Sequence, residues 1–256
     1  MKLVLASLYK ELIYKKRYLA NTLTTMILFC VIFVVLLRGY SAITGNSSLF
    51  NFGDTTAGLV VSYYAWTMIL SVYTSTGYIV TQNKQNGTLE NVISNTRHFT
   101  LLLVCESIVS SVIYFVFSWL IIGALTLICG VKLHFMVFDV FVILMIGLLS
   151  VLGLSLIVAG AAMVFRKMDG IMSILQFLLL GGLFLPASTV SSLIIPFYSA
   201  NNMLMDIFID GTSLLHLDTY SYIMLLSNSL LYMVIGVLIF NLCMKTAKQK
   251  GTLAFY

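Results

Sequence analysis

Residues 137–165 read VFDVFVILMIGLLSVLGLSLIVAGAAMVF, and this run decides the class of fold. A helix of this length, rising about 1.5 Å per residue, is longer than the roughly 30 Å hydrocarbon core of a bilayer. It is therefore expected to tilt or to extend beyond the membrane. The run is apolar on every face, whereas a strand of a transmembrane barrel alternates over about ten residues. The sequence predicts an all-α membrane protein.

The rest of the chain has the same character. Of its 256 residues, 60% are hydrophobic and only 9% are charged, and the mean hydropathy is +1.04. A soluble domain carries roughly 25% charged residues. Runs near 20 apolar residues predict six membrane spans within one domain that covers the whole chain. The spans are expected at about residues 21–37, 57–80, 99–129, 137–165, 171–190 and 222–244.

Basic residues give the orientation, because they concentrate on the cytoplasmic side of membrane proteins. With the N-terminus inside, the inner segments hold Lys2, Lys10, Lys15, Lys16, Arg17, Lys84, Arg97, Arg166, Lys167, Lys245, Lys248 and Lys250, and the outer segments hold Arg38 and Lys132. This asymmetry predicts cytoplasmic termini in a multi-pass protein of the cell membrane, and the composition favours a bacterial plasma membrane. The net charge of +5 then reflects orientation and attraction to anionic lipid, so it does not indicate nucleic acid.

Between the second and third apolar runs lies KQNGTLENVISNTRH, residues 84–98. Gly87 is expected to break the preceding helix, and Thr88 is a good N-cap for a new one. Glu90 falls in the first turn, where a carboxylate suits the positive end of the helix dipole. The segment therefore predicts a short helix on the cytoplasmic side.

This short helix carries one apolar stripe. Leu89, Val92 and Ile93 fall at positions i, i+3 and i+4, which share a face. A helix of about two turns is not stable alone in water, so it needs a surface to lie against. The chain offers little soluble protein for that purpose, and the stripe is therefore a candidate docking element for another protein.

The N-terminal segment, residues 1–18, predicts an amphipathic helix. One face gathers Leu5, Leu8, Tyr9 and Leu12, and the other gathers Ser7, Lys10, Glu11 and Tyr14. The basic cluster that follows would meet lipid phosphates, so the helix is expected to lie in the inner membrane interface. The alternative is an ordinary basic flank that only fixes the orientation.

The outer segment before the last span, residues 182–218, is unlike the other loops. Pro186 and Pro196 accompany two short apolar pieces, residues 191–197 and 203–209. Neither piece is long enough to cross a membrane. The pattern predicts re-entrant helices that dip into the outer leaflet and return, a geometry tolerated where the backbone is buried in protein.

Motifs for catalysis and nucleotide binding are absent from the sequence. The histidines, His98, His134 and His216, fall in three different segments on both sides of the membrane, and no metal-binding spacing is present. The GxxxxGK[ST] phosphate loop is also missing. The chain is therefore expected to have no enzyme activity, no metal site and no cofactor of its own.

Glu106 is the exception among nearly uncharged spans, about two turns into the third. An intramembrane carboxylate can be a proton or cation site. The favoured interpretation is that it lies near the inner interface or pairs with a neighbouring helix. Gln176 and Asn228 are interpreted as residues that hydrogen-bond between helices.

Residues 86–90, NGTLE, resemble the signature that opens the coupling helix in permease subunits of type-2 (structural type V) ATP-binding-cassette exporters. The likeness extends over the predicted interfacial helix, the six spans and the re-entrant outer segment. Gln85 stands where that family often has an acidic residue.

The resemblance implies a set of partners. Leu89, Val92 and Ile93 would seat in a groove of a separate nucleotide-binding subunit, which would bind ATP and Mg²⁺. A second permease subunit, identical or different, would complete a central path lined by the first, second and fifth spans. The expected function is ATP-driven export of an amphipathic or hydrophobic cargo, such as a peptide, drug or lipid.

Two other classes of function stay open. An ion-driven secondary transporter or channel would require several intramembrane ionisable residues, and usually inverted repeats. A membrane-embedded enzyme would require polar side chains that converge at one depth. The sequence shows neither feature.

Overall fold

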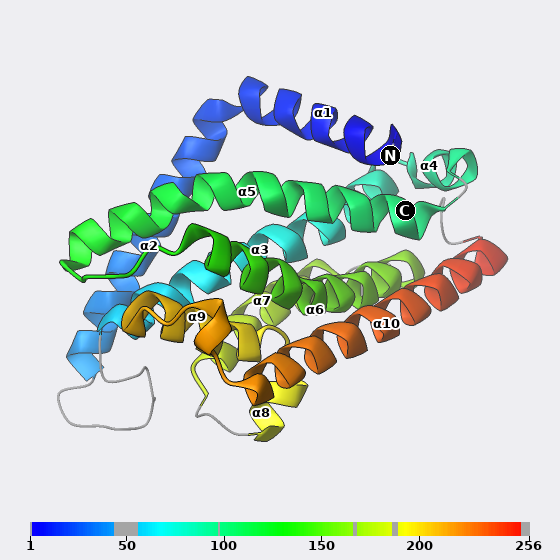
Figure 1. Ribbon diagram of the computed structural model, residues 1–256. Helices are drawn as coiled ribbons and strands as arrows, with labels where there is room; N and C mark the ends of the chain where they lie inside the picture. Colours follow the sequence, from blue (N-terminus) through cyan, green and yellow to red (C-terminus); the bar gives the residue numbers. More distant parts are fainter. Residues whose placement is uncertain (1, 44–55, 97, 166–167, 186–188, 252–256) are drawn as a thin grey trace.

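The computed structural model describes residues 2–43, 56–96, 98–165, 168–185 and 189–251. Throughout these ranges the secondary structure is helical and no strand occurs, so the all-α prediction is confirmed. Figure 1 shows α4 at the same end of the bundle as the start of α1 and the end of α10, with α9 toward the opposite end. Which side of a membrane this end faces stays a prediction.

Five helices in the described part are long and apolar enough to cross a membrane. They are α2 (Leu19–Ile43), α3 (Thr56–Gln85), α5 (Phe99–Cys129), α6 (Val137–Val164) and α10 (Thr219–Lys250). They correspond to the first, second, third, fourth and sixth predicted spans. The length and composition of these helices are consistent with a multi-pass membrane protein.

The fifth predicted span is shorter than expected. Instead of residues 171–190, helix α7 covers Asp169–Leu183, and its 15 residues extend about 22 Å, less than the hydrocarbon core. The backbone N–H of Phe184 turns back to the carbonyls of Gly181 and Gly182. The sequence then reaches Pro186, which disfavours helix in the residue before it. The predicted outer boundary of this span was wrong. That α7 crosses the membrane stays a prediction.

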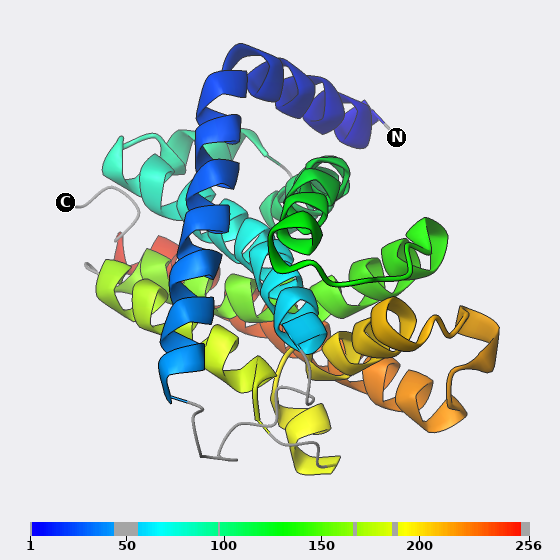
Figure 2. The ribbon, with the colours of Figure 1, turned by 90° about the vertical axis from the view of Figure 1, so that its left-hand side faces the viewer.

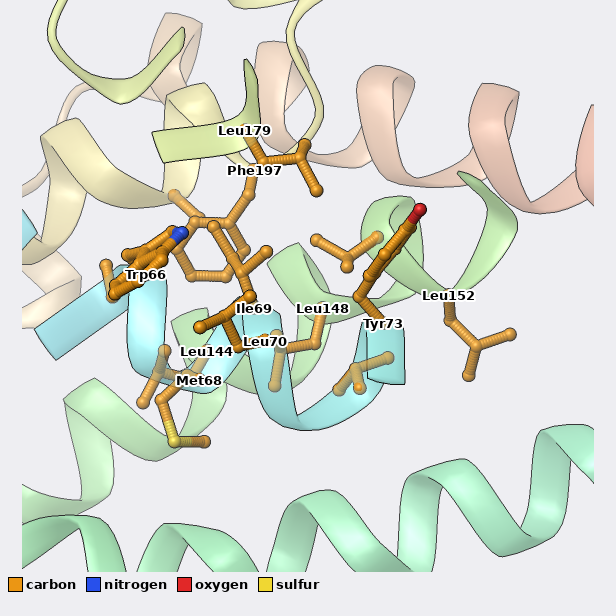
Figure 3. Packing of buried hydrophobic residues seen from close by; sticks show 14 of the residues in the cluster. Trp66, Met68, Ile69, Leu70, Tyr73, Leu144, Leu148, Leu152, Leu179 and Phe197 are labelled. Carbon is orange, nitrogen blue, oxygen red and sulfur yellow. The ribbon is translucent and has the colours of Figure 1, made fainter. Parts of the chain in front are cut away.

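Helix α3 forms the centre of the bundle, as the end-on view of Figure 2 shows. In its most apolar 18-residue stretch, 83% of the residues are buried. Figure 3 shows Met68 and Ile69 of α3 facing Leu144 and Leu148 of α6, with Phe197 above them. The contact between α3 and α6 is therefore part of a core that also includes buried residues of α5, α9 and α10.

Helix α7 is joined to α3 by hydrogen bonds to its own backbone. Trp66 donates its indole N–H to the carbonyl of Gln176 (3.3 Å), and Tyr73 donates its hydroxyl to the carbonyl of Met172 (3.2 Å). Both acceptors are peptide oxygens, so α7 is held by main-chain groups while much of its apolar surface is exposed. The bond at Gln176 uses its backbone carbonyl, so the predicted role of its side chain stays a prediction.

Helices α6 and α10 pack with their backbones in contact. A Cβ atom on Gly153 would lie 2.2 Å from the carbonyl oxygen of Tyr232, and one on Gly236 would lie 2.3 Å from the carbonyl oxygen of Gly153. Small residues allow such approach, and in lipid this close packing replaces the hydrophobic driving force between helices. The pair therefore forms the tightest helix contact of the fold.

Helix α1 (Lys2–Arg17) lies along α5 and turns polar groups toward it. Lys10 pairs with Glu106, and Ser7 is buried. The apolar side chains Leu5 and Tyr9 are 59% and 71% exposed, on the side away from the bundle. The amphipathic helix is thus present with its apolar face turned outward, and its place in the membrane interface stays a prediction.

Two short α-helices lie between α7 and α10, where the re-entrant pieces were expected, and a 3₁₀ helix at Leu214–His216 follows them. Helix α8 covers Thr189–Ile194, and α9 covers Tyr198–Asp210 with most of its residues buried. Asn228 of α10 donates to the carbonyls at the end of α8, those of Ser192, Leu193 and Ile195. The interhelical role of Asn228 is confirmed, and both helices are too short to cross a membrane.

Candidate functional site

The α3–α4 corner is the part of the structure that matches the sequence signature. Helix α3 ends at Gln85, Gly87 adopts a left-handed φ of +68°, and α4 covers Leu89–Asn95. A residue with a Cβ is strained at such a φ, so the glycine permits the sharp change of direction. The predicted helix break and short helix are confirmed.

Thr88 stabilises this corner in a way that the sequence did not predict. Its side chain makes no capping bond to α4. Instead, its hydroxyl and its backbone N–H both donate to Asn83, the hydroxyl to Oδ1 at 2.9 Å and the N–H to the carbonyl at 2.9 Å. Thr88 therefore closes the end of α3 rather than the start of α4, because a partner five residues earlier lies within reach.

The apolar stripe on α4 faces the chain's own core. Leu89 is fully buried and Ile93 is 4% exposed, while Val92 is partly buried against the same core. The three residues do share one face, as expected. The prediction that this face is open to a partner was wrong, because the core of the same chain already covers it.

The exposed face of α4 is polar. Glu90 lies in its first turn, and Asn91 and Ser94 follow on the same exposed surface. Gly87 and Thr88 are exposed at its start. A protein that binds this corner would therefore meet a carboxylate, an amide and a hydroxyl rather than an apolar stripe.

Lys84 attaches the corner to α6. This buried side chain donates to the carbonyls of Ala162 (2.7 Å), Met163 (3.3 Å) and Phe165 (2.8 Å). The last carbonyls of a helix have no partner within the helix, so the lysine supplies donors that they lack. Its positive charge also suits the negative end of the helix dipole. In the sequence, Lys84 indicates only the orientation of the chain. A charge placed one residue before the end of a long apolar helix was the available hint.

Glu106 lies apart from this arrangement, in the contact between α1 and α5. Its carboxylate accepts a bond of 2.7 Å from Lys10, whose side chain is 66% exposed while that of Glu106 is 13% exposed. Of the alternatives left open for Glu106, the structure shows a pair with a neighbouring helix. In the part of the chain that is described, no group of three or more His, Cys, Asp or Glu residues is arranged to hold a metal ion.

Comparisons of this chain with family models, curated proteins and solved structures found no match. The family suggested by the resemblance of residues 86–90 therefore stays a prediction.

Proposed function

We propose that this chain is the membrane-spanning permease subunit of an ATP-driven exporter, with α4 as its contact to a separate ATPase subunit. The observation that carries the proposal is the two-sided construction of α4. One side is fixed to the chain by Leu89 and Ile93, and the other side presents Glu90, Asn91 and Ser94 to the surroundings. A seven-residue helix fixed in this way moves with the bundle when something pulls on its exposed face.

The other features of the chain support the same proposal. Its long apolar helices supply a membrane domain, and its sequence lacks a phosphate loop, so ATP and Mg²⁺ would bind to the partner. ATP binding would draw two such subunits together, and their movement would reach the permease through α4. A two-state membrane domain biased by a ligand is the physical basis of that switch.

The apolar surfaces on α2 and α7 support a second permease subunit. Ile27 and Val35 on α2 are 64% and 65% exposed, and Phe177 on α7 is 67% exposed. These helices correspond to two of the three spans that line the path in the resembling family. An apolar path suits an amphipathic or hydrophobic cargo. A proton-driven mechanism has less support, because Glu106 is occupied by Lys10.

The test compares two exposed positions on the predicted cytoplasmic side. The tagged chain is purified alone and from cells that coexpress its ATPase partner, and ATP hydrolysis is measured. We expect no turnover by the chain alone and a stable, active complex after coexpression. Ser94→Arg should reduce copurified ATPase at least tenfold, because it places a bulky charge on the docking face.

Gln249→Arg is the matched control, since it adds the same charge at an exposed position at the end of α10. It should leave the complex intact. Hydrolysis of ATP by the isolated chain, or equal ATPase recovery with both variants, would refute the proposal.

A further inference from the structure

Lys84 holds the end of α6 although it belongs to another helix. Its ammonium group is buried and donates to three carbonyls, 78 to 81 residues away in the sequence. Burying an ammonium group is costly unless hydrogen bonds replace its water. The three carbonyls and the negative end of the α6 dipole provide that replacement. The contact is therefore a strong, direct attachment between α3 and α6.

Other helix ends in the structure show that such an attachment is not required to finish a helix. Helices α5, α9 and α10 end on Gly130, Gly211 and Gly251, each in the left-handed conformation with φ between +63° and +67°. Their C-caps satisfy the last carbonyls locally. Helix α6 ends instead at Phe165 with extended backbone, and Lys84 reaches its carbonyls from α3. Lys84 thus does more than terminate a helix, because it joins two.

On its other side, Lys84 is adjacent to the corner that carries α4. Asn83 and Thr88 are hydrogen-bonded to each other across this corner. Leu89 and Ile93 bury the inner face of α4. These contacts leave α4 little freedom relative to the end of α3, so a displacement of α4 reaches Lys84 directly.

Helix α6 can carry such a displacement further. Gly153 touches the backbone of α10 at Tyr232. One turn away, the hydroxyl of Ser150 accepts the backbone N–H of Phe197, the residue before α9, at 2.9 Å. Phe197 is buried and has a φ of +69°, an unusual value for a residue with a bulky side chain. The contacts therefore run from α4 through Lys84 to α6, and from α6 to α10 and α9.

We infer that Lys84 is a positioning residue that makes α4 and the α6–α10 pair move as one unit. Its ammonium group transmits the position of the corner to the end of α6. The consequence for transport rests on the proposed function, in which an ATPase displaces α4. The mechanical link itself is a property of this chain alone, and it can be measured without a partner.

The experiment measures the distance between α4 and α10 in the full-length chain. Spin labels are placed on cysteines introduced at Ser94 and Lys245, both exposed, and pulsed electron resonance records the distance distribution. The native cysteines to be replaced by serine are Cys30, Cys105, Cys129 and Cys243. We expect Lys84→Met to widen the distribution at least twofold. Lys84→Arg, which keeps the charge and the donors, should retain the original width.

Lys250→Met is the matched control, because it removes an exposed lysine near the same end of the bundle. It should leave the distribution unchanged. An unchanged width in Lys84→Met, with faster hydrogen exchange only in residues 161–165, would overturn the inference, since Lys84 would then be a local cap. If neither Lys84→Met nor Lys84→Gln folds, the inference is also overturned in favour of a purely structural role. The distance measurement is made without an ATPase. If no ATPase partner exists, the proposed function is refuted, but the measured distances between α4 and α10 are unaffected.

Discussion

Helices α2 and α6 are both long and apolar, yet they occupy very different environments. In the most apolar stretch of α6, 61% of the residues are buried inside the protein, against 11% in α2. Figure 2 shows α2 on the outside of the bundle. Tyr63 of α3 donates its hydroxyl to the backbone carbonyl of Phe29 on α2 at 2.7 Å. Hydrophobicity places both helices in a membrane, but it does not decide which of them packs tightly.

Small residues explain the difference. Helix α6 carries Gly147, Gly153 and Gly160, and at each of them an added Cβ would press on a neighbouring helix. The apolar part of α2, residues 21–37, contains no glycine. Because lipid tails are as apolar as leucine, packing between membrane helices depends on such close approach. Four predictions test this contrast between the packed and the peripheral helices.

The largest effect is expected at the α6–α10 contact. Gly153→Leu would place side-chain atoms where the carbonyl of Tyr232 now lies, 2.2 Å from an ideal Cβ. Backbone cannot yield as a flexible side chain does, so we expect a loss of about 3 kcal/mol or more in unfolding free energy. The measurement is denaturation in mixed micelles. Ala20→Leu on α2, at an exposed position, should change stability by less than about 0.5 kcal/mol. Equal losses of unfolding free energy in the two variants would contradict the contrast between the packed and the peripheral helices.

A smaller effect should separate two serines on α6. Ser150 accepts the N–H of Phe197, whereas Ser155 donates to the carbonyl of Leu152 in its own helix. Ser150→Ala leaves a buried N–H without its acceptor and should cost about 1–3 kcal/mol. Ser155→Ala should cost about 0.5 kcal/mol or less, because the carbonyl of Leu152 belongs to a continuous helix. Matching losses in the same denaturation assay would show that the link to α9 contributes nothing.

The peripheral helix α1 should contribute less still. Glu106→Gln removes the pair with Lys10, whose largely exposed side chain is screened by solvent, so the stability change should stay below about 1 kcal/mol. Efflux of a lipophilic fluorescent dye from membrane vesicles should keep its rate, with or without a proton gradient. Glu11→Gln on α1 is the control. Loss of gradient dependence in Glu106→Gln alone would instead identify Glu106 as a proton carrier.

The smallest effect is a pH dependence at α9. Burial, with a further contribution from Asp210, raises the pKa of Asp206 above its ordinary value of 3.8. The native state therefore binds more protons than the unfolded state, and stability falls as pH rises from about 4 through the native pKa. Asp206→Asn should remove this decline in a thermal-unfolding series. Asp218→Asn, at an exposed position, should retain it. Identical pH profiles for the two variants would exclude Asp206 as the source.

The sequence predicts the long helices well because the hydrocarbon thickness sets the length of an apolar run. The third predicted span coincides with α5, and the fourth differs from α6 by one residue. The fifth was extended too far, because an apolar run contains no mark for the place where a helix stops, and only Pro186 indicates it. The two short apolar pieces of the outer segment were found in the sequence, but the first and last residues of α9 were not predicted.

The candidate site was predicted in place but not in orientation. The spacing of Leu89 and Ile93 correctly shows that one face of α4 is buried, but a spacing cannot say which protein buries it. The partners of Thr88 and Lys84 lie at Asn83 and at the end of α6, and the second of these is far away in the sequence. The Lys84 contact depends on tertiary structure and the Thr88 contact on the shape of the α3–α4 corner, so local rules for helix caps and basic residues do not reveal them.

The way α7 is attached to α3 has an evolutionary consequence. Trp66 and Tyr73 bond to peptide oxygens of α7, and every residue type supplies such an oxygen. Substitutions along α7 therefore leave these two anchors intact. Its exposed side chains, among them Ile174 and Phe177, can drift in size and polarity without detaching the helix. The attachment leaves the exposed face of α7 free to diversify.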